Sequence, residues 1–350
     1  MAAPKRRQRR NASPARPLRR PATLADVAKI AGVSPMTASR ALQKPHLVAE
    51  DTAARVRDAA EALAYVPNRI AGGLSSQRSN VVIAVIPSTL NPIFSALVEA
   101  LRVELLGAGY QLFLGLSDYA TQREDELIHT VVGRRPDGIV LTGVVHSPEL
   151  RWRLQAAHIP VVETWDLTPT PIDMLVGFSN EGAGRAAAHH LLARGCRRPA
   201  LLIADDQRAQ LRREGFVAAL RERGAPLAAA EVVRAPSSVG AARGALGRLL
   251  AADPTVDGLF CSSDQLAMGV LFEASARGLA VPERLAVVGF GDVETAAHTH
   301  PSLTTVAVDG AAIGREAARM LLARLEGGAA GGDGRRVVDV GFRIVARESA

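Results

Sequence analysis

Two groups of residues have the chemistry to bind other molecules, and the first group lies within one short segment. Thr37 and Ser39 carry hydroxyl groups, and Arg40 carries a guanidinium. Such side chains hydrogen-bond to phosphates or base edges, and an arginine can pair bidentately with guanine. Pro35 and Met36 can make only apolar contacts, for example with a thymine methyl group. This segment is therefore a candidate for reading DNA.

The second group follows the ends of apolar, strand-like runs. Amides, hydroxyls, carboxylates, aromatic rings and a guanidinium occur there, and such groups bind small polar molecules. The residues are Asn91, Phe94, Tyr119, Thr142, Trp165, Asp166, Asn180, Arg212, Ser263, Asp264, Phe290 and Asp292. Because ligands bind at the carboxyl ends of parallel strands, these positions predict a small-molecule pocket. At each position the alternative is a loop residue without a ligand role, and Trp165 could instead fill the core.

The chain lacks the motifs of common catalytic and metal sites. No GxGxxG follows a strand-like run, and neither a P-loop nor a GxSxG elbow is present. Cys196 and Cys261 are far apart and have no histidine or cysteine at metal-ligand spacing. His189 and His190 are adjacent, so a helix would point them apart. We therefore expect no enzyme activity, no metal and no cofactor.

Positive charge is concentrated at the N-terminal end. The formal net charge is +7, and residues 1–80 hold 15 Lys and Arg against 5 Asp and Glu. Clustered basic residues attract nucleic-acid phosphates through counterion release. Residues 1–21 are predicted to be a disordered basic tail, which alone could be no more than a solvated segment. The excess continues beyond that tail, so a nucleic-acid partner is expected.

Three short helices are predicted after the tail. Thr23, followed three residues later by Asp26, resembles a capping box. Gly32 would end the first helix and Ser34 would cap the second, while Glu50–Leu63 forms a third run with one apolar face. Two helices joined by a tight turn form a helix-turn-helix, whose second helix enters the major groove. A plain three-helix bundle with a polar surface is the alternative.

From Val81 onward, apolar strand-like runs alternate with helical segments. Runs of this length between helices predict a parallel sheet that is covered on both faces. A second series of the same kind begins near residue 199. Two successive series predict two lobes with a ligand cleft between them. The predicted fold class is thus an all-α helix-turn-helix unit joined to an α/β two-lobed domain.

The motifs DVA, AGVS, TASR and YVPN follow one another between residues 26 and 68. In their order and spacing the segment resembles the headpiece of the LacI family of bacterial regulators, and the resemblance continues through the rest of the chain. It implies a headpiece at 22–66, a hinge helix or linker at 67–79 and a periplasmic-binding-protein-like effector and dimerisation domain at 80–350. The implied DNA contacts are Thr23, Leu24, Ser34, Pro35, Met36, Thr37, Ser39, Arg40, Tyr65, Asn68, Ala71 and Leu74. Leu74 would wedge into the minor groove of a kinked operator.

The resemblance also implies how the effector domain is divided. Residues 81–178 would form most of the first lobe and 180–289 most of the second, with the chain crossing back near 290 and again near 325. Arg212 stands where an arginine of the family usually reaches a ligand hydroxyl or carboxylate, and its planar guanidinium suits both groups.

The implied ligand class follows from three short segments. PMTASR, VVETWD and VGFSN are most similar to the corresponding segments of gluconate-utilisation repressors, so a sugar acid is the expected ligand. Gly291 stands where a carboxylate that often binds hydroxyls is usual, which argues against a neutral sugar. The carboxylate of Glu163 would repel an anionic ligand unless it is turned away or paired.

These observations together predict a ligand-responsive transcriptional regulator. A single recognition helix contacts few base pairs, so a homodimer on a palindromic operator is expected. The N-terminus lacks the apolar core of a signal peptide, and no apolar run reaches about 18 residues, so we expect a cytoplasmic protein without a membrane partner. The alternatives are a sugar- or nucleoside-responsive member of the same family and, in another class, a sugar-binding transport component.

Overall fold

The computed structural model describes residues 22–66, 78–327 and 336–350. Internal contacts divide the chain between Ser79 and Asn80 into a helical unit and an α/β unit. The predicted basic tail, 1–21, and the predicted hinge residues Asn68, Ala71 and Leu74 lie outside the described residues. No helix within the described ranges is long and apolar enough to cross a membrane.

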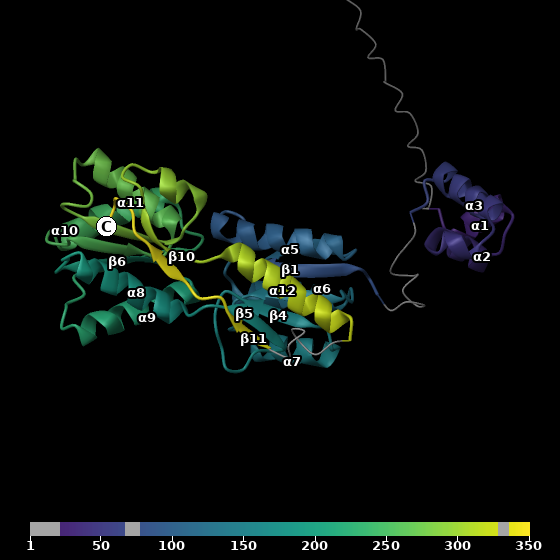
Figure 1. Ribbon diagram of the computed structural model, residues 1–350, viewed down its shortest axis with the longest axis horizontal. Coiled ribbons are helices and arrows are strands. Elements are labelled where there is room, and N and C mark those ends of the chain that lie inside the picture. Colours follow the sequence, from purple (N-terminus) through teal and green to yellow (C-terminus); the bar gives the residue numbers. More distant parts are fainter. Residues whose placement is uncertain (1–21, 67–77, 328–335) are drawn as a thin grey trace, which may run out of the picture. The chain divides into compact units, whose positions relative to one another are not determined.

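The helical unit is built from short helices with local capping signals (Figure 1). Thr23 and Asp26 form a reciprocal capping box, and Gly32 ends the first helix with a φ of 67°, in the left-handed region that glycine adopts readily. Ser34 caps the second helix through the backbone N–H of Thr37. These predicted caps are confirmed. The elements are α1 (Leu24–Ala31), α2 (Pro35–Gln43), the 3-10 helix η1 (Pro45–Leu47) and α3 (Glu50–Ala62).

Small apolar side chains fill the core of the helical unit. They come from all three α-helices and comprise Val27, Ala28, Ala31, Ala38, Ala41, Val56, Ala59 and Ala60. Alanine at most of these positions lets the helices approach closely, so three short elements can share one core. Leu63, just after α3, is partly buried and packs against this core.

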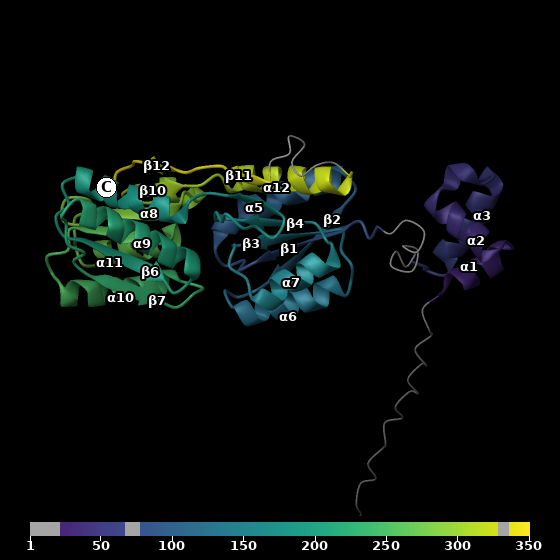
Figure 2. The same cartoon turned by 90° about the horizontal axis from the view of Figure 1, so that it is seen from below.

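The strands of the α/β unit form two six-stranded sheets, one in each lobe (Figure 2). The first sheet has the order β11-β5-β4-β3-β1-β2 and the second the order β12-β10-β9-β8-β6-β7. All pairings are parallel except that of β10 with β12. The first sheet comprises β1 (Val81–Ile86), β2 (Gln111–Leu116), β3 (Gly138–Thr142), β4 (Val161–Thr164), β5 (Met174–Gly177) and β11 (Val337–Asp339). The second comprises β6 (Pro199–Ala204), β7 (Ala230–Val233), β8 (Gly258–Cys261), β9 (Ala286–Gly291), β10 (Thr304–Ala307) and β12 (Arg343–Val345).

Helices cover both faces of each sheet. In the first lobe α5 and α12 lie on one face, with α6 and α7 on the other (Figure 2). In the second lobe α8 packs against α9 and α10 packs against α11. The bounds are η2 (Pro92–Phe94), α5 (Ser95–Gly107), α6 (Thr121–Val132), α7 (Pro148–Ala157), α8 (Asn180–Ala193), α9 (Gln207–Glu222), α10 (Val239–Ala252), α11 (Asp264–Ala276), η3 (Glu294–His298) and α12 (Gly310–Leu325).

The chain passes between the lobes at places that differ from our expectation. The expected crossings near 290 and 325 are wrong. β9 and β10 both belong to the second sheet, so the chain returns to the first lobe only at 308–309, just before α12. β11 then pairs with β5, and the chain crosses again at 340–342 before β12 pairs with β10. The physical reason is that the buried strand β10 extends the second sheet beyond β9.

Candidate ligand site and nucleic-acid interface

A pocket opens where the carboxyl ends of the two sheets face each other. Eight of its lining residues are sequence candidates: Asn91, Phe94, Tyr119, Trp165, Asn180, Arg212, Ser263 and Phe290. They follow β1, β2, β4 and β5 of the first lobe or, in the second lobe, belong to β9 and α9 or come shortly after β8. Parallel strands place their carboxyl ends together, which is why residues so distant in sequence meet here.

Arg212 is the most buried charged side chain of this pocket. It is 5% exposed and comes from the second turn of α9. One guanidinium nitrogen, Nη1, donates to Asn180 Oδ1, and Nη2 donates to the carbonyl of Ser262 at 3.1 Å. Its guanidinium carbon lies 4.0 Å from the ring centroid of Phe290, close enough for a cation–π contact. Nε is buried and has no partner among the described residues.

The charge of Arg212 survives its burial. Loss of water around the guanidinium lowers its pKa to about 10, so the side chain remains a cation at neutral pH. A buried donor without a partner costs free energy, which a ligand oxygen would recover. The site is therefore suited to an acceptor, and most of all to an anionic one.

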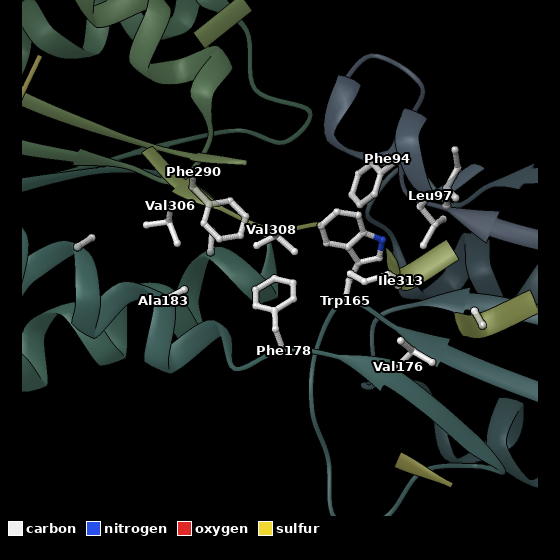
Figure 3. Close-up of a cluster of buried hydrophobic side chains, with 14 of the residues drawn as sticks. Phe94, Leu97, Trp165, Val176, Phe178, Ala183, Phe290, Val306, Val308 and Ile313 are labelled. Carbon is white, nitrogen blue, oxygen red and sulfur yellow. The ribbon is translucent and has the colours of Figure 1, made fainter. Parts of the chain in front are cut away.

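Four aromatic rings that line the pocket, Phe94, Trp165, Phe178 and Phe290, lie close to one another (Figure 3). Phe94 meets Trp165 edge to face at a centroid distance of 5.3 Å, and Trp165 meets Phe178 at 6.0 Å. Phe178 in turn lies 6.0 Å from Phe290, so the rings join the two lobes. Trp165 is held in the left-handed region with a φ of 71°, and Asn180 donates to its carbonyl at 2.9 Å. Such strain, of about 1–3 kcal/mol, is common at binding sites.

Two charged residues that line this pocket, Asp206 and Arg208, were not among the candidates predicted from the sequence. Asp206 caps α9 by accepting from Ala209 N at 3.1 Å. Arg208 belongs to the second lobe but donates from Nη1 to the carbonyl of Thr142 in the first lobe at 3.2 Å, and its guanidinium lies 5.7 Å from the Phe94 centroid. Arg208 could have been predicted from the sequence, because it stands four positions before Arg212 and therefore lies on the same face of the helix.

Four of the sequence candidates do not line this pocket and have other partners. Thr142 contributes its carbonyl to Arg208, and Asp166 accepts from Leu167 N at 2.9 Å. Asp264 accepts from Thr305 Oγ1 at 2.6 Å and Val293 N at 2.9 Å, and burial raises its pKa to about 6. Asp292 pairs with Arg347 at 2.7 Å. These groups fix the loops around the pocket instead of facing it. Within the described residues no cluster of His, Cys, Asp or Glu could hold a metal ion.

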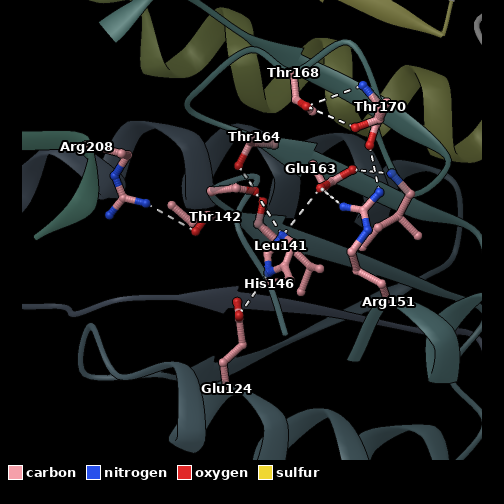
Figure 4. A network of polar contacts seen from close by, with 12 residues as sticks. Glu124, Leu141, Thr142, His146, Arg151, Glu163, Thr164, Thr168, Thr170 and Arg208 are labelled. Carbon is pink, nitrogen blue, oxygen red and sulfur yellow. Dashed lines mark hydrogen bonds and ion pairs between the residues drawn. The ribbon is translucent and has the colours of Figure 1, made fainter. Parts of the chain in front are cut away.

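Glu163 is turned away from the pocket into a buried ionic network (Figure 4). His146 Nδ1 lies 2.9 Å from Glu124 Oε2, and His146 Nε2 lies 3.4 Å from Glu163 Oε1. Arg151 Nη1 is 3.7 Å from the same Glu163 oxygen, and Ile172 N donates to Oε2. Burial alone would lower the pKa of His146, but hydrogen bonds to the two carboxylates and their charges raise it to about 9. The carboxylate of Glu163 is therefore paired.

This network predicts a loss of stability at alkaline pH. The folded pKa of His146 is about 9 against an ordinary 6.5, so the contribution is complete below about pH 6.5 and disappears as the pH rises through 9. The change is on the order of 3 kcal/mol in unfolding free energy. Urea unfolding of wild type and His146→Gln at pH 6 and 9.5 measures it. The two curves should converge at the higher pH, whereas the exposed control His298→Gln should follow wild type throughout. A constant gap between wild type and His146→Gln would contradict the assignment.

The helical unit presents part of the predicted DNA-contact set to solvent. Pro35, Met36 and Arg40 are exposed on α2, and Met36 is 73% exposed although it is apolar. Thr37 Oγ1 lies 2.9 Å from Ser34 Oγ. Ser39 is half-buried on α2, and Thr23 is an exposed cap of α1. Leu24 and Tyr65 pack against the core. The N-terminal part of α2 is thus the candidate nucleic-acid interface.

Comparisons with known proteins agree with the assignment of the helical unit and of the two-lobed unit. Residues 23–68 match the family model of bacterial regulatory proteins of the lacI family, and residues 188–350 match a periplasmic binding protein-like domain. The chain is 42% identical to the HTH-type transcriptional regulator GntR of Pseudomonas aeruginosa over 93% of this chain and 95% of that protein. It is 32% identical to the HTH-type transcriptional regulator IdnR of Escherichia coli over 92% and 96%, respectively.

A solved structure supports the same assignment across the whole fold. A transcriptional regulator of this family from Silicibacter pomeroyi superposes with a TM-score of 0.87 at 33% identity, covering 94% of this chain and 99% of that chain. The sequence motifs, the helix-turn-helix and the two-lobed domain all agree with these matches. The chain is a DNA-binding transcriptional regulator and belongs to the LacI family of bacterial regulatory proteins.

Proposed function

We propose that this regulator is a repressor whose effector is a sugar acid of the gluconate class, bound between the lobes. The observation that carries the proposal is the buried guanidinium of Arg212, whose Nε has no partner within the described part of the chain. A ligand carboxylate would accept a charge-assisted hydrogen bond there. A neutral sugar or a nucleoside is the alternative effector.

The charges around the pocket support an acidic ligand. Two arginines, Arg208 and Arg212, line it against one aspartate, Asp206. Glu163 is paired elsewhere, so it does not repel an anion. Gly291 supplies no carboxylate, and its φ of 129° is a conformation that a side-chain-bearing residue adopts only with strain. Aromatic rings and the hydroxyl of Ser263 remain for the carbon chain and hydroxyl groups of a sugar acid.

The two lobes supply a mechanism without a chemical step. An effector that binds one arrangement of the lobes better shifts the population toward it, and the spacing of two headpieces changes with it. We propose that the active species is a homodimer that binds a palindromic operator in the cytoplasm and is released by the effector. Exposed apolar residues on the edge strand β2, Phe113 and Leu114, and on the adjacent α5, Val103 and Leu106, support pairing through the first lobes.

Replacement of Arg212 tests the ligand class. Arg212→Ala should weaken gluconate binding at least about tenfold, because a charge-assisted contact contributes roughly 1.5–3 kcal/mol and about 1.4 kcal/mol is one decade. Calorimetry with gluconate, its keto derivatives and the matching neutral sugars measures the loss. Arg213→Ala, at an exposed position of the same helix, is the matched control and should bind like wild type.

A folding control and a comparison of ligands distinguish a loss of the ligand contact from a loss of structure. Thermal unfolding must first show that Arg212→Ala is folded, and its binding to the operator without effector should persist. Equal binding of gluconate and its neutral counterpart by wild type would remove the carboxylate argument. If a nucleoside binds and no sugar acid does, the effector is a nucleoside, which is the alternative named above.

A further inference from the structure

A second compartment of the cleft continues beyond the ligand pocket. Thr121, Glu124 and Gln207 lie in its wall and not in that of the pocket. The compartment and the pocket share three lining residues, Tyr119, Asp206 and Arg208. A ligand that fills the pocket and extends past these shared side chains would therefore enter the compartment.

Helix α9 gives the direction in which such a ligand would extend. Arg212 lies in its second turn, Arg208 lies four residues earlier on the same face, and Gln207 is its first residue. The pocket includes both arginines, whereas the compartment includes Arg208 and Gln207 but not Arg212. A ligand with its acid group at Arg212 that extended along α9 toward Arg208 would reach the compartment.

Glu124 is a preorganised acceptor in the wall of this compartment. Its side chain is 10% exposed, and Oε2 is held by His146 Nδ1 at 2.9 Å. His146 is fixed from its other side by the carbonyl of Gly143 at 3.2 Å and by Glu163. Among the described residues no hydrogen bond reaches Glu124 Oε1. A carboxylate oxygen that is oriented but unoccupied accepts a hydrogen bond from a ligand hydroxyl.

The polar groups of the compartment favour hydroxyls over a second anion. Two carboxylates, Glu124 and Asp206, line it beside one arginine, Arg208. The positive charge that balances Glu124 lies on the buried His146, whose side chain is 1% exposed. The hydroxyl of Thr142, also in the wall, is buried and has no partner in the ranges that the structure describes. A phosphate or second carboxylate would find no net positive charge here, whereas a polyhydroxylated group would find acceptors and donors.

We propose that this compartment is a subsite for a second sugar unit, so that the preferred effector is a glycosylated sugar acid, an aldobionic acid. This inference rests on the proposed function, because it takes the acid group to be held at Arg212. Glu124 would accept from the hydroxyls of the second sugar, while Gln207 and Thr121 would border it. His146 is a positioning residue that acts through Glu124.

Calorimetry on the full chain tests the subsite with the 4-O-glycosyl gluconates lactobionate and maltobionate against gluconate. We expect at least one aldobionate to bind about tenfold more tightly than gluconate. Glu124→Gln and, separately, Gln207→Ala should reduce that preference toward unity. Gln207 is exposed, so its replacement keeps the test valid if Glu124→Gln folds poorly. The matched control Glu126→Gln, at an exposed position of the same helix α6, should retain the preference.

The results test the subsite and the proposed sugar-acid effector separately. If gluconate binds in an Arg212-dependent manner but both aldobionates bind equally or more weakly, the subsite is wrong and the proposed function stands. A preference that survives both Glu124→Gln and Gln207→Ala would also overturn it. If no sugar acid binds, the proposed function fails and the subsite fails with it.

Discussion

A chain that lacks residues 1–79 is expected to lose specific operator binding by at least about a thousandfold, while it still folds and binds its effector. The loss follows because the basic excess and the helix-turn-helix both precede residue 80. Specific sites are bound about 10³–10⁷ times more tightly than other DNA. The remaining unit contains both sheets and their own buried clusters.

Fluorescence anisotropy with a labelled operator measures the loss of DNA binding by the truncated chain. Calorimetry measures whether it still binds the effector. Arg40→Ala in the full chain should cause a smaller loss of operator specificity, because loss of one bidentate contact with a base costs about 1–3 kcal/mol of discrimination. Specific operator binding by the truncated chain would show that DNA is read by another surface. Loss of effector binding would show that the two units depend on each other.

Gly184→Ala should destabilise the protein by about 3 kcal/mol and weaken effector binding as well. A Cβ atom at Gly184 on α8 would lie 1.8 Å from the backbone oxygen of Arg212 on α9, and one at Gly215 would lie 1.9 Å from the oxygen of Glu181. The helices touch through their backbones, so a methyl group must push them apart. Overpacking typically costs about 1–3 kcal/mol, and a contact with backbone has little room to relax.

The effect on the ligand follows from what these helices carry. Asn180 begins α8, Arg212 lies on α9, and their side chains are hydrogen-bonded within the pocket. Gly240→Ala is the matched control, because a Cβ there meets nothing within 4 Å and alanine favours the helix by up to about 1 kcal/mol. Urea unfolding and calorimetry compare the three proteins. Wild-type stability and affinity in Gly184→Ala would mean that the helices separate at little cost.

Local patterns were sufficient for the helical unit and for most strands. The caps at Thr23 and Ser34 depend on residues three positions away, which the sequence displays directly. The strand β5 has only four residues and pairs with β11 about 160 residues later. Such distant pairing has no local signal, and the crossings between lobes were misplaced for the same reason.

The pocket was predictable to the extent that strand ends determine it. Phe94, Trp165 and Arg212 meet because parallel strands align their carboxyl ends. Asp264 and Asp292 occupy equivalent positions, but they face Thr305 and Arg347 instead. Their partners lie about 40 and 55 residues away, so only the assembled fold reveals which carboxylates are already satisfied.

The crossing of the chain at 308–309 has a consequence for biosynthesis. The first lobe is largely made by residue 178, but α12, which packs on α5, is synthesised only after the entire series β6–β10. At about 5–20 residues per second, the ribosome needs on the order of ten seconds to reach it. During that interval the face of α5 that meets α12, where the Leu97 backbone and Ala100 approach Gly314, lacks its cover. The nascent chain is therefore expected to be a client of ribosome-associated chaperones until its last fifth has emerged.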